Sequence, residues 1–154
     1  MNYLQTAKET LDLYTQEIDR LKQRLSDEFN QAVELMLYCE GRVVVAGIGK
    51  SGLVGKKMVA TFASTGTPSF FLHPTEAFHG DLGMLKPIDV VILISNSGET
   101  DDVNKLIPSL KSFGNKIIAI TGNPHSTLGK YADVVLNIHV EREACPNNLA
   151  PTTS

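Results

Sequence analysis

The chain has 154 residues, of which 42% are hydrophobic and 20% are charged, a size and composition typical of one globular domain with a core. Its formal net charge of -3 argues against a nucleic-acid partner, which needs a large basic field, so an anionic ligand must be held by a local site. No stretch approaches the roughly 18 consecutive apolar residues of a membrane helix, and the N-terminal residues are too polar for a secretory leader. We therefore expect a cytoplasmic protein with no membrane partner, in which Cys39 and Cys145 are reduced thiols.

The N-terminal quarter of the chain is predicted to be helical. From residue 2 to residue 39, apolar or aromatic side chains recur every three or four positions. Ser26 and Asp27 favour a helix N-terminus, so the segment can also form two helices with a joint at this point. The apolar stripe fits two roles equally, packing on the domain's own sheet or on a partner subunit. We assign residues 1–40 to packing or oligomerisation and expect at least a dimer.

Beyond Arg42, short apolar runs alternate with helical patterns. The runs that predict strands are Val43–Ala46, Ser69–Leu72, Val90–Ile94, Lys116–Ile120 and Val134–Ile138. Continuous β-branched runs of this kind are typical of strands buried on both faces of a parallel sheet. The alternation of strand and helix over residues 41–154 predicts a doubly wound, mostly parallel five-stranded α/β sheet of the flavodoxin-like class.

In such a sheet, ligands bind beyond the carboxyl ends of the strands, where polar turns follow. The turn Gly47–Gly52 matches G-x-G-x-x-G, but the next strand ends without the acidic residue that a dinucleotide site needs for its ribose hydroxyls. A P-loop is excluded because its first glycine would fall at Val44. What remains is a glycine turn at the start of a helix. It serves either only for packing or as an anion site, in which the free N–H groups of the helix bind the anion and Gly49 and Ser51 are candidate ligands.

The turn after the 90–94 run is more informative, because it places three hydroxyl side chains around a glycine. Hydroxyls and backbone amides at a strand-to-helix turn form a neutral cradle for phosphate, which lets an acidic protein bind an anion. The candidate ligands are Ser95, Asn96, Ser97 and Thr100. The alternative is an ordinary serine-rich loop. A third turn, at 121–124, follows the next strand.

The sequence Ser-Asn-Ser-Gly-Glu-Thr at positions 95–100 is similar to the phosphate signature of the SIS (sugar isomerase) domain family, which residues 41–154 resemble. Other segments narrow the resemblance to the arabinose 5-phosphate isomerases of Gram-negative bacteria: Gly47–Gly52, Ala63–Pro68, His79–Met84 and Glu143–Pro146. The resemblance implies an aldose–ketose isomerase that interconverts D-ribulose 5-phosphate and D-arabinose 5-phosphate through an enediol. Such an enzyme supplies the Kdo pathway of lipopolysaccharide or capsule, and the resemblance implies a homodimer or homotetramer.

Carried over position by position, the resemblance places functional polar residues at Lys50, His79, Asp102 and Glu143. The family has glutamate at position 102, so the role of the shorter Asp102 stays open. A carboxylate can move the proton between C1 and C2, and the Lys50 cation can stabilise the developing oxyanion. This route requires no cofactor and no metal. His79 and Asp81 offer only two ligands to an opportunistic zinc ion, which is too few for a site.

We expect Glu143 to be the base, because it lies just beyond a strand predicted to extend to Val140. Glu141 would point to the opposite face if that strand continued. His73, His125 and His139 are interpreted as structural or surface residues. In the family, Ala150–Ser154 begins another helix, so a C-terminally truncated domain without the CBS pair is expected.

Two other functions fit the same pattern. One is a SIS isomerase of another sugar phosphate. The other is a non-catalytic sugar-phosphate sensor of a transcription regulator, which is disfavoured because no helix-turn-helix pattern precedes the domain in the sequence.

Overall fold

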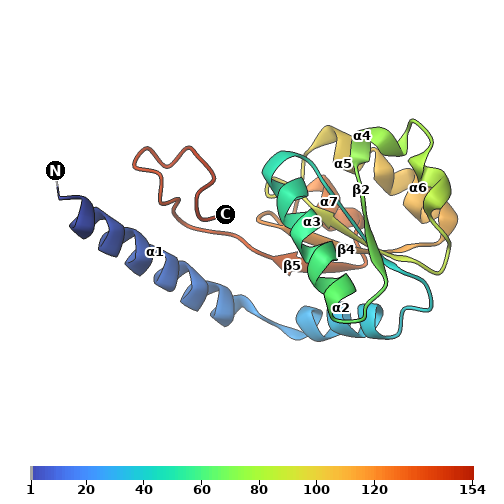
Figure 1. Ribbon diagram of the computed structural model, residues 1–154, viewed down its shortest axis with the longest axis horizontal. Coiled ribbons are helices and arrows are strands. Elements are labelled where there is room, and N and C mark those ends of the chain that lie inside the picture. The colour runs from blue at the N-terminus through green and yellow to red at the C-terminus, as the bar shows by residue number, and fades with distance from the viewer. Residues whose placement is uncertain (1) are drawn as a thin grey trace.

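The computed structural model describes residues 2–154 and places one parallel sheet between two layers of helices (Figure 1). The strands are β1 (Val43–Gly47), β2 (Ser69–Leu72), β3 (Val90–Ile94), β4 (Lys116–Thr121) and β5 (Val134–Asn137). Their order is β2-β1-β3-β4-β5, and every neighbouring pair is parallel. The central strands β1 and β3 are buried at every position, because both of their faces are covered. The predicted five-stranded α/β sheet is confirmed.

The helices divide between the two faces of the sheet. They are α1 (Tyr3–Arg24), α2 (Asp27–Leu37), α3 (Gly49–Ser64), α4 (Pro74–Ala77), α5 (Asp101–Asn104), α6 (Leu106–Phe113) and α7 (Thr127–Tyr131), with a 3-10 turn η1 (Asp81–Met84). Apolar residues of α2 and α3 pack on one face, and those of α5, α6 and α7 pack on the other. The short α4, α7 and η1 were not predicted, because they are too short to show a periodic pattern. Within residues 2–154 no helix has both the length and the apolar character needed to span a membrane.

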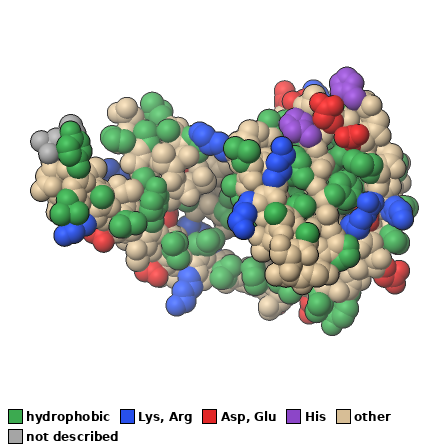
Figure 2. All heavy atoms as spheres, viewed as in Figure 1, with side chains coloured by type: hydrophobic (Ala, Val, Ile, Leu, Met, Phe, Trp, Pro, Cys, Tyr) green, Lys and Arg blue, Asp and Glu red, His purple; other side chains and the backbone are tan. Residues whose placement is uncertain are grey.

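The N-terminal segment is two helices rather than one, and only the second packs on the sheet. The joint is at Leu25 and Ser26, which both have extended backbone conformations. Ala32 of α2 is buried against the sheet, whereas α1 extends away from the domain (Figure 1). Leu4 of α1 remains 67% exposed, and hydrophobic side chains are visible along this helix in Figure 2. The prediction that the N-terminal segment packs on the domain's own sheet is therefore confirmed for α2 and wrong for α1.

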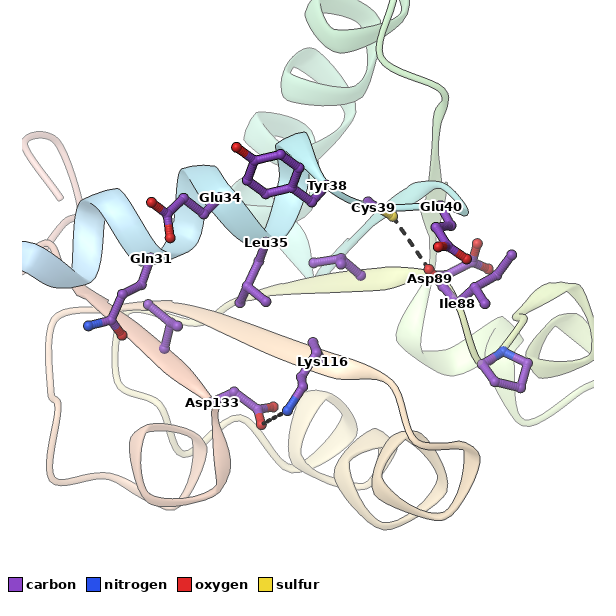
Figure 3. Close-up of a pocket in the computed structure, with 13 residues that line it drawn as sticks. Gln31, Glu34, Leu35, Tyr38, Cys39, Glu40, Ile88, Asp89, Lys116 and Asp133 are labelled. Atoms are coloured by element: carbon purple, nitrogen blue, oxygen red, sulfur yellow. Dashed lines mark hydrogen bonds and ion pairs between the residues drawn. The ribbon is translucent and has the colours of Figure 1, made fainter.

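Two aspartates fix the amino ends of the strands. Asp89, 1% exposed, accepts the backbone N–H groups of Arg42 and Lys86 at 2.8 Å each and pairs with the Arg42 guanidinium at 3.1 Å. Asp133 accepts the Ile117 N–H at 2.8 Å and pairs with Lys116 at 3.3 Å (Figure 3). Burial acts to raise the pKa of Asp133, but the Ile117 N–H, Lys111 and Lys116 together outweigh it and the pKa is lowered. Both carboxylates have their oxygens occupied by structural partners.

Candidate active site

The carboxyl ends of β1, β3 and β4 lie side by side, since Gly47 is in register with Ile94 and Ile94 with Ile120. The polar turns that follow these strands therefore meet at one edge of the sheet. Hydrogen bonds join two of them directly, because the Gly122 N–H donates to the Asn96 carbonyl at 2.9 Å. The topology brings together the turns at 47–52, 95–100 and 121–124, as the sequence predicted.

The 95–100 turn is organised by its own hydroxyl groups. Ser95 is 2% exposed, and its Oγ lies 2.8 Å from Thr100 Oγ1 and accepts the Gly98 N–H at 3.1 Å. Ser97 is exposed, and its Oγ accepts the Glu99 N–H at 3.1 Å. A hydroxyl that accepts one bond still has a proton to donate. The buried Ser95 hydroxyl thus stabilises the turn through internal hydrogen bonds, whereas the Ser97 hydroxyl is exposed to solvent.

Gly98 locks this turn against the loop that precedes α7. Its φ of +67 lies in the left-handed region, and a Cβ at this position would overlap the Ser126 side chain. The Gly98 carbonyl accepts the Leu128 N–H at 3.1 Å, and Glu99 Oε1 accepts the Thr127 N–H at 2.7 Å. The predicted phosphate turn is therefore attached to a second loop by contacts on both sides.

The 47–52 turn combines close packing with exposed polar groups. A Cβ on Gly52 would lie 2.7 Å from the Gly47 carbonyl oxygen, so glycine allows the strand and the helix to approach. Gly49 begins α3, Lys50 is exposed, and Ser51 is half-buried. The packing role proposed for this turn is present, and its polar groups remain accessible to a ligand.

A hollow of about 310 Å³ beside this turn contains His73, a residue that was interpreted from the sequence as structural or surface. The lining of the hollow also includes Gly49 and Lys56. His73 follows the last residue of β2, and its Nδ1 accepts the Thr75 N–H at 3.3 Å. Its position directly after a predicted strand was the signal that placed it at the ligand edge.

A second hollow, of about 230 Å³, lies where β5 ends, and Glu143 lines it. Its other lining residues are Asn96, Gly122, Asn123, His139, Val140, Glu141 and Asn148. The strand predicted to reach Val140 stops at Asn137, so the alternation that would separate Glu141 from Glu143 does not apply. Both glutamates line the hollow, and so does His139, which was interpreted as structural or surface. The expectation that only one glutamate faces the site depended on a continuing strand, and that condition is not met.

The carboxylate of Glu143 is surrounded by hydrogen-bond donors. Its Oε2 accepts the backbone N–H groups of Thr152 at 2.7 Å, Thr153 at 2.6 Å and Ser154 at 3.3 Å, and the Ser154 hydroxyl donates to Oε1. Partial burial acts to raise the pKa of Glu143, but these donors, led by the Ser154 hydroxyl, lower it to about 2. The group is therefore ionised at neutral pH.

The other three predicted catalytic residues lie outside this hollow. Asp102, in α5, pairs with Lys105 at 3.2 Å, and nearly half of its side chain is exposed. His79 is an exposed residue between α4 and η1, and Lys50 is exposed at the start of α3. None of the three lines either of the two hollows described above. In the part of the chain that the structure describes, no three His, Cys, Asp or Glu residues are grouped so as to hold a metal ion.

Comparisons with known proteins agree on one family. The model of the SIS domain matches residues 36–154. The chain is 73% identical over 154 residues to "Probable arabinose 5-phosphate isomerase" of Haemophilus influenzae, covering 100% of the chain and 46% of that protein. It is 58% identical to the arabinose 5-phosphate isomerase KpsF of Escherichia coli, covering 99% of the chain and 47% of that protein. The chain thus spans about half the length of the curated relatives it matches.

A solved structure gives the same result for the fold. The Escherichia coli CFT073 protein c3406, determined in complex with arabinose 5-phosphate, superposes with a TM-score of 0.93 at 44% sequence identity. The match covers 100% of this chain and 84% of that chain. The fold described above is therefore one that holds this ligand in a similar protein.

Proposed function

The chain belongs to the SIS domain family, and on that premise we propose that it forms the isomerase domain of an arabinose 5-phosphate isomerase. The reaction is the interconversion of D-ribulose 5-phosphate and D-arabinose 5-phosphate. The observation that carries the proposal is the similarity to isomerases of this name along the whole chain, at up to 73% identity. The polar edge of the sheet is consistent with it, because hydroxyl and amide groups gather there in an acidic protein.

In this proposal the phosphate is bound by neutral donors of two turns. Ser97, Thr100 and Asn96 provide donors from the 95–100 turn, and Ser95 holds that turn in shape through its bond to Thr100. Gly49 and Ser51 contribute from the start of α3, where backbone N–H groups have no partner within the helix. Neutral donors suit a protein whose net charge is -3, because they bind the anion without a large basic field.

The chemistry of the proposed reaction requires ring opening and then proton transfer between C1 and C2. Glu143 is the proposed base, and its position in the hollow next to Asn96 supports this. Its low pKa means that it is ionised at neutral pH, as a base must be before it takes the proton. Lys50 is proposed to stabilise the oxyanion of the enediol from the 47–52 turn. Asp102 and His79 stay in the proposed catalytic set through the family resemblance, and no cofactor or metal is invoked.

The cellular setting is proposed on the same basis. We place the protein in the cytoplasm and its product in Kdo synthesis for lipopolysaccharide or capsule. Residues 1–40 are proposed to form the oligomer interface of a homodimer or homotetramer, with residues 41–154 as the sugar-phosphate domain. The exposed apolar residues of α1 support this, because a free helix with Leu4, Leu11 and Ile18 more than 60% exposed would gain stability from a partner surface.

A coupled isomerase assay with a panel of pentose and hexose phosphates tests the proposal. Turnover of arabinose 5-phosphate well above that of hexulose phosphates is the expected result. A preference for a hexulose phosphate would identify another SIS isomerase. Sugar-phosphate binding by calorimetry without any turnover would identify a regulatory domain.

A further inference from the structure

One charged residue of α1 is buried although most of the helix is exposed. Glu17 is 4% exposed and is the only buried residue of α1, whose residues are all described. Carboxylates are seldom buried in proteins unless they are paired, since burial removes the water that solvates them. The position of Glu17 therefore requires partners that hold it there.

Those partners come from the segment that follows β5. Glu17 Oε2 accepts the backbone N–H of Glu141 at 3.2 Å, across a sequence separation of 124 positions. Arg20 donates to Glu17 Oε1 and lies 3.2 Å from Glu141 Oε2, so the three residues form a closed ring of contacts. The Arg24 guanidinium adds a bond of 2.5 Å to the His139 carbonyl. One side of α1 is thus attached to residues 139–141.

Beyond Asn137 the segment leaves the sheet in steps. The Ile138 N–H still donates to the Thr121 carbonyl of β4, the His139 N–H donates to Asn137 Oδ1, and the Glu141 N–H is held by Glu17. The same segment lines the 230 Å³ hollow through His139, Glu141 and Glu143. On its other side, Glu17 lines an apolar hollow of about 420 Å³ together with Thr153 and Ser154, the residues that donate to Glu143.

We propose that Glu17 is a positioning residue of the isomerase, which holds residues 139–143 so that Glu143 faces the substrate edge. The inference rests on the proposed function and adds to it a residue outside the sugar-phosphate domain. Glu17 contacts the segment through a backbone N–H, so it sets the path of the chain rather than taking part in the chemistry. The hydrogen bonds of Glu17 go to Arg20 and Glu141 and those of the phosphate turn at 95–100 go elsewhere, so we expect that turn to keep its geometry when Glu17 is replaced.

The test compares Glu17→Ala and Glu17→Gln with Asp19→Asn, a control that removes one negative charge from an exposed position of the same helix. We expect Glu17→Ala to lower kcat on arabinose 5-phosphate by about 10- to 100-fold with KM changed less than about twofold, because misplaced catalytic groups reduce turnover and not phosphate binding. Glu17→Gln keeps an acceptor for the Glu141 N–H and recovers part of the rate. Asp19→Asn stays at the wild-type rate.

A second readout keeps this inference separate from the proposed function. Amide hydrogen exchange of residues 139–143, measured without substrate, is expected to accelerate at least roughly tenfold in Glu17→Ala and less in Glu17→Gln. If the wild-type protein has no isomerase activity, the proposed function fails, and the exchange rates alone decide whether Glu17 holds the segment. Unchanged exchange and unchanged kcat in Glu17→Ala overturn the proposal. A matching fall of kcat and stability in both Glu17 variants, with exchange raised across the whole domain, also overturns it.

Discussion

The two edges of the sheet use polar side chains in opposite ways. At the amino edge, Asp89 and Asp133 have their oxygens occupied by backbone N–H groups and by Arg42, Lys111 and Lys116. At the carboxyl edge, hydroxyls and amides gather around glycine turns, and Lys50 and Ser97 are exposed. The two aspartates hold strands in place with oxygens that are already bonded, whereas the exposed Ser97 hydroxyl accepts one bond and has a proton left to donate to a ligand. The difference between these two sets of groups is whether hydrogen-bonding capacity remains after folding.

Removing an amino-edge carboxylate should have the largest effect. We expect Asp89→Ala to lower the free energy of unfolding by about 3–5 kcal/mol, because it leaves two backbone N–H groups and the Arg42 guanidinium without their buried acceptor. Urea unfolding followed by circular dichroism measures this. The control is Glu40→Ala, because Glu40 is an exposed carboxylate that lines, together with Asp89, the pocket drawn in Figure 3. It should change stability by less than about 0.5 kcal/mol. A loss below about 1 kcal/mol for Asp89→Ala would contradict the structural role.

At the carboxyl edge, the largest effect should fall on turnover. Glu143→Gln keeps size and an acceptor oxygen but removes the base, so kcat should fall by about 10²-fold or more while substrate binding is nearly unchanged. Steady-state kinetics and calorimetry on the same preparation separate the two quantities. Glu141→Gln should do little, because Glu17 holds the backbone N–H of Glu141, which the substitution retains, and the exposed side-chain pair with Arg20 is weak. Wild-type turnover in Glu143→Gln would move the base to another group, with Asp102 as the first candidate.

The phosphate turn should show a smaller effect, confined to affinity. Ser97→Ala removes one exposed hydroxyl and should weaken sugar-phosphate binding by about 0.5–3 kcal/mol, the range for one hydrogen bond to a charged acceptor. Isothermal titration calorimetry gives the difference. Ser112→Ala, which removes an exposed hydroxyl from α6, should leave the affinity as it was. Equal affinities for wild type and Ser97→Ala would refute the assignment of this turn.

The smallest effect should be on stability in acid. The pKa of Glu143 is about 2 in the folded protein against an ordinary value of 4.5, so its contribution is complete above pH 4.5 and is lost as the pH falls towards 2. Solvent screens this partly exposed group, so the loss should stay below about 1 kcal/mol. Unfolding free energies at about pH 5 and about pH 3 for wild type and Glu143→Gln measure it. An identical decrease in both proteins would show that the donors around Glu143 do not favour its charged form.

The sheet was predictable from sequence because its signals are local. The runs Val43–Ala46 and Val90–Ile94 are apolar at every position, and the structure places both in central strands. The polar turns then follow from topology, since parallel strands bring their carboxyl ends to one edge. The exposed face of α1 was less predictable, because an apolar stripe has the same period whichever surface covers it.

The end of β5 could not be predicted from the local apolar pattern. The apolar pattern continues to Val140, but the Asn137 Oδ1 accepts the His139 N–H at 3.0 Å, and this side-chain bond turns the chain out of the sheet. The asparagine was a signal available in the sequence. The burial of Glu17 had no such signal, because its partner Glu141 lies 124 positions away in the sequence and a glutamate beside an apolar stripe is ordinarily solvated.

The contact between Gly98 and Ser126 has a mechanical consequence. No side chain fits between the 95–100 turn and the loop before α7, and hydrogen bonds from Thr127 and Leu128 join them on both sides. Two loops joined in this way cannot move independently, so they should fluctuate as one rigid body. A phosphate bound by the 95–100 turn would therefore be held as firmly as the two joined loops are. Helix α7 would reduce the thermal motion of that phosphate without contacting it.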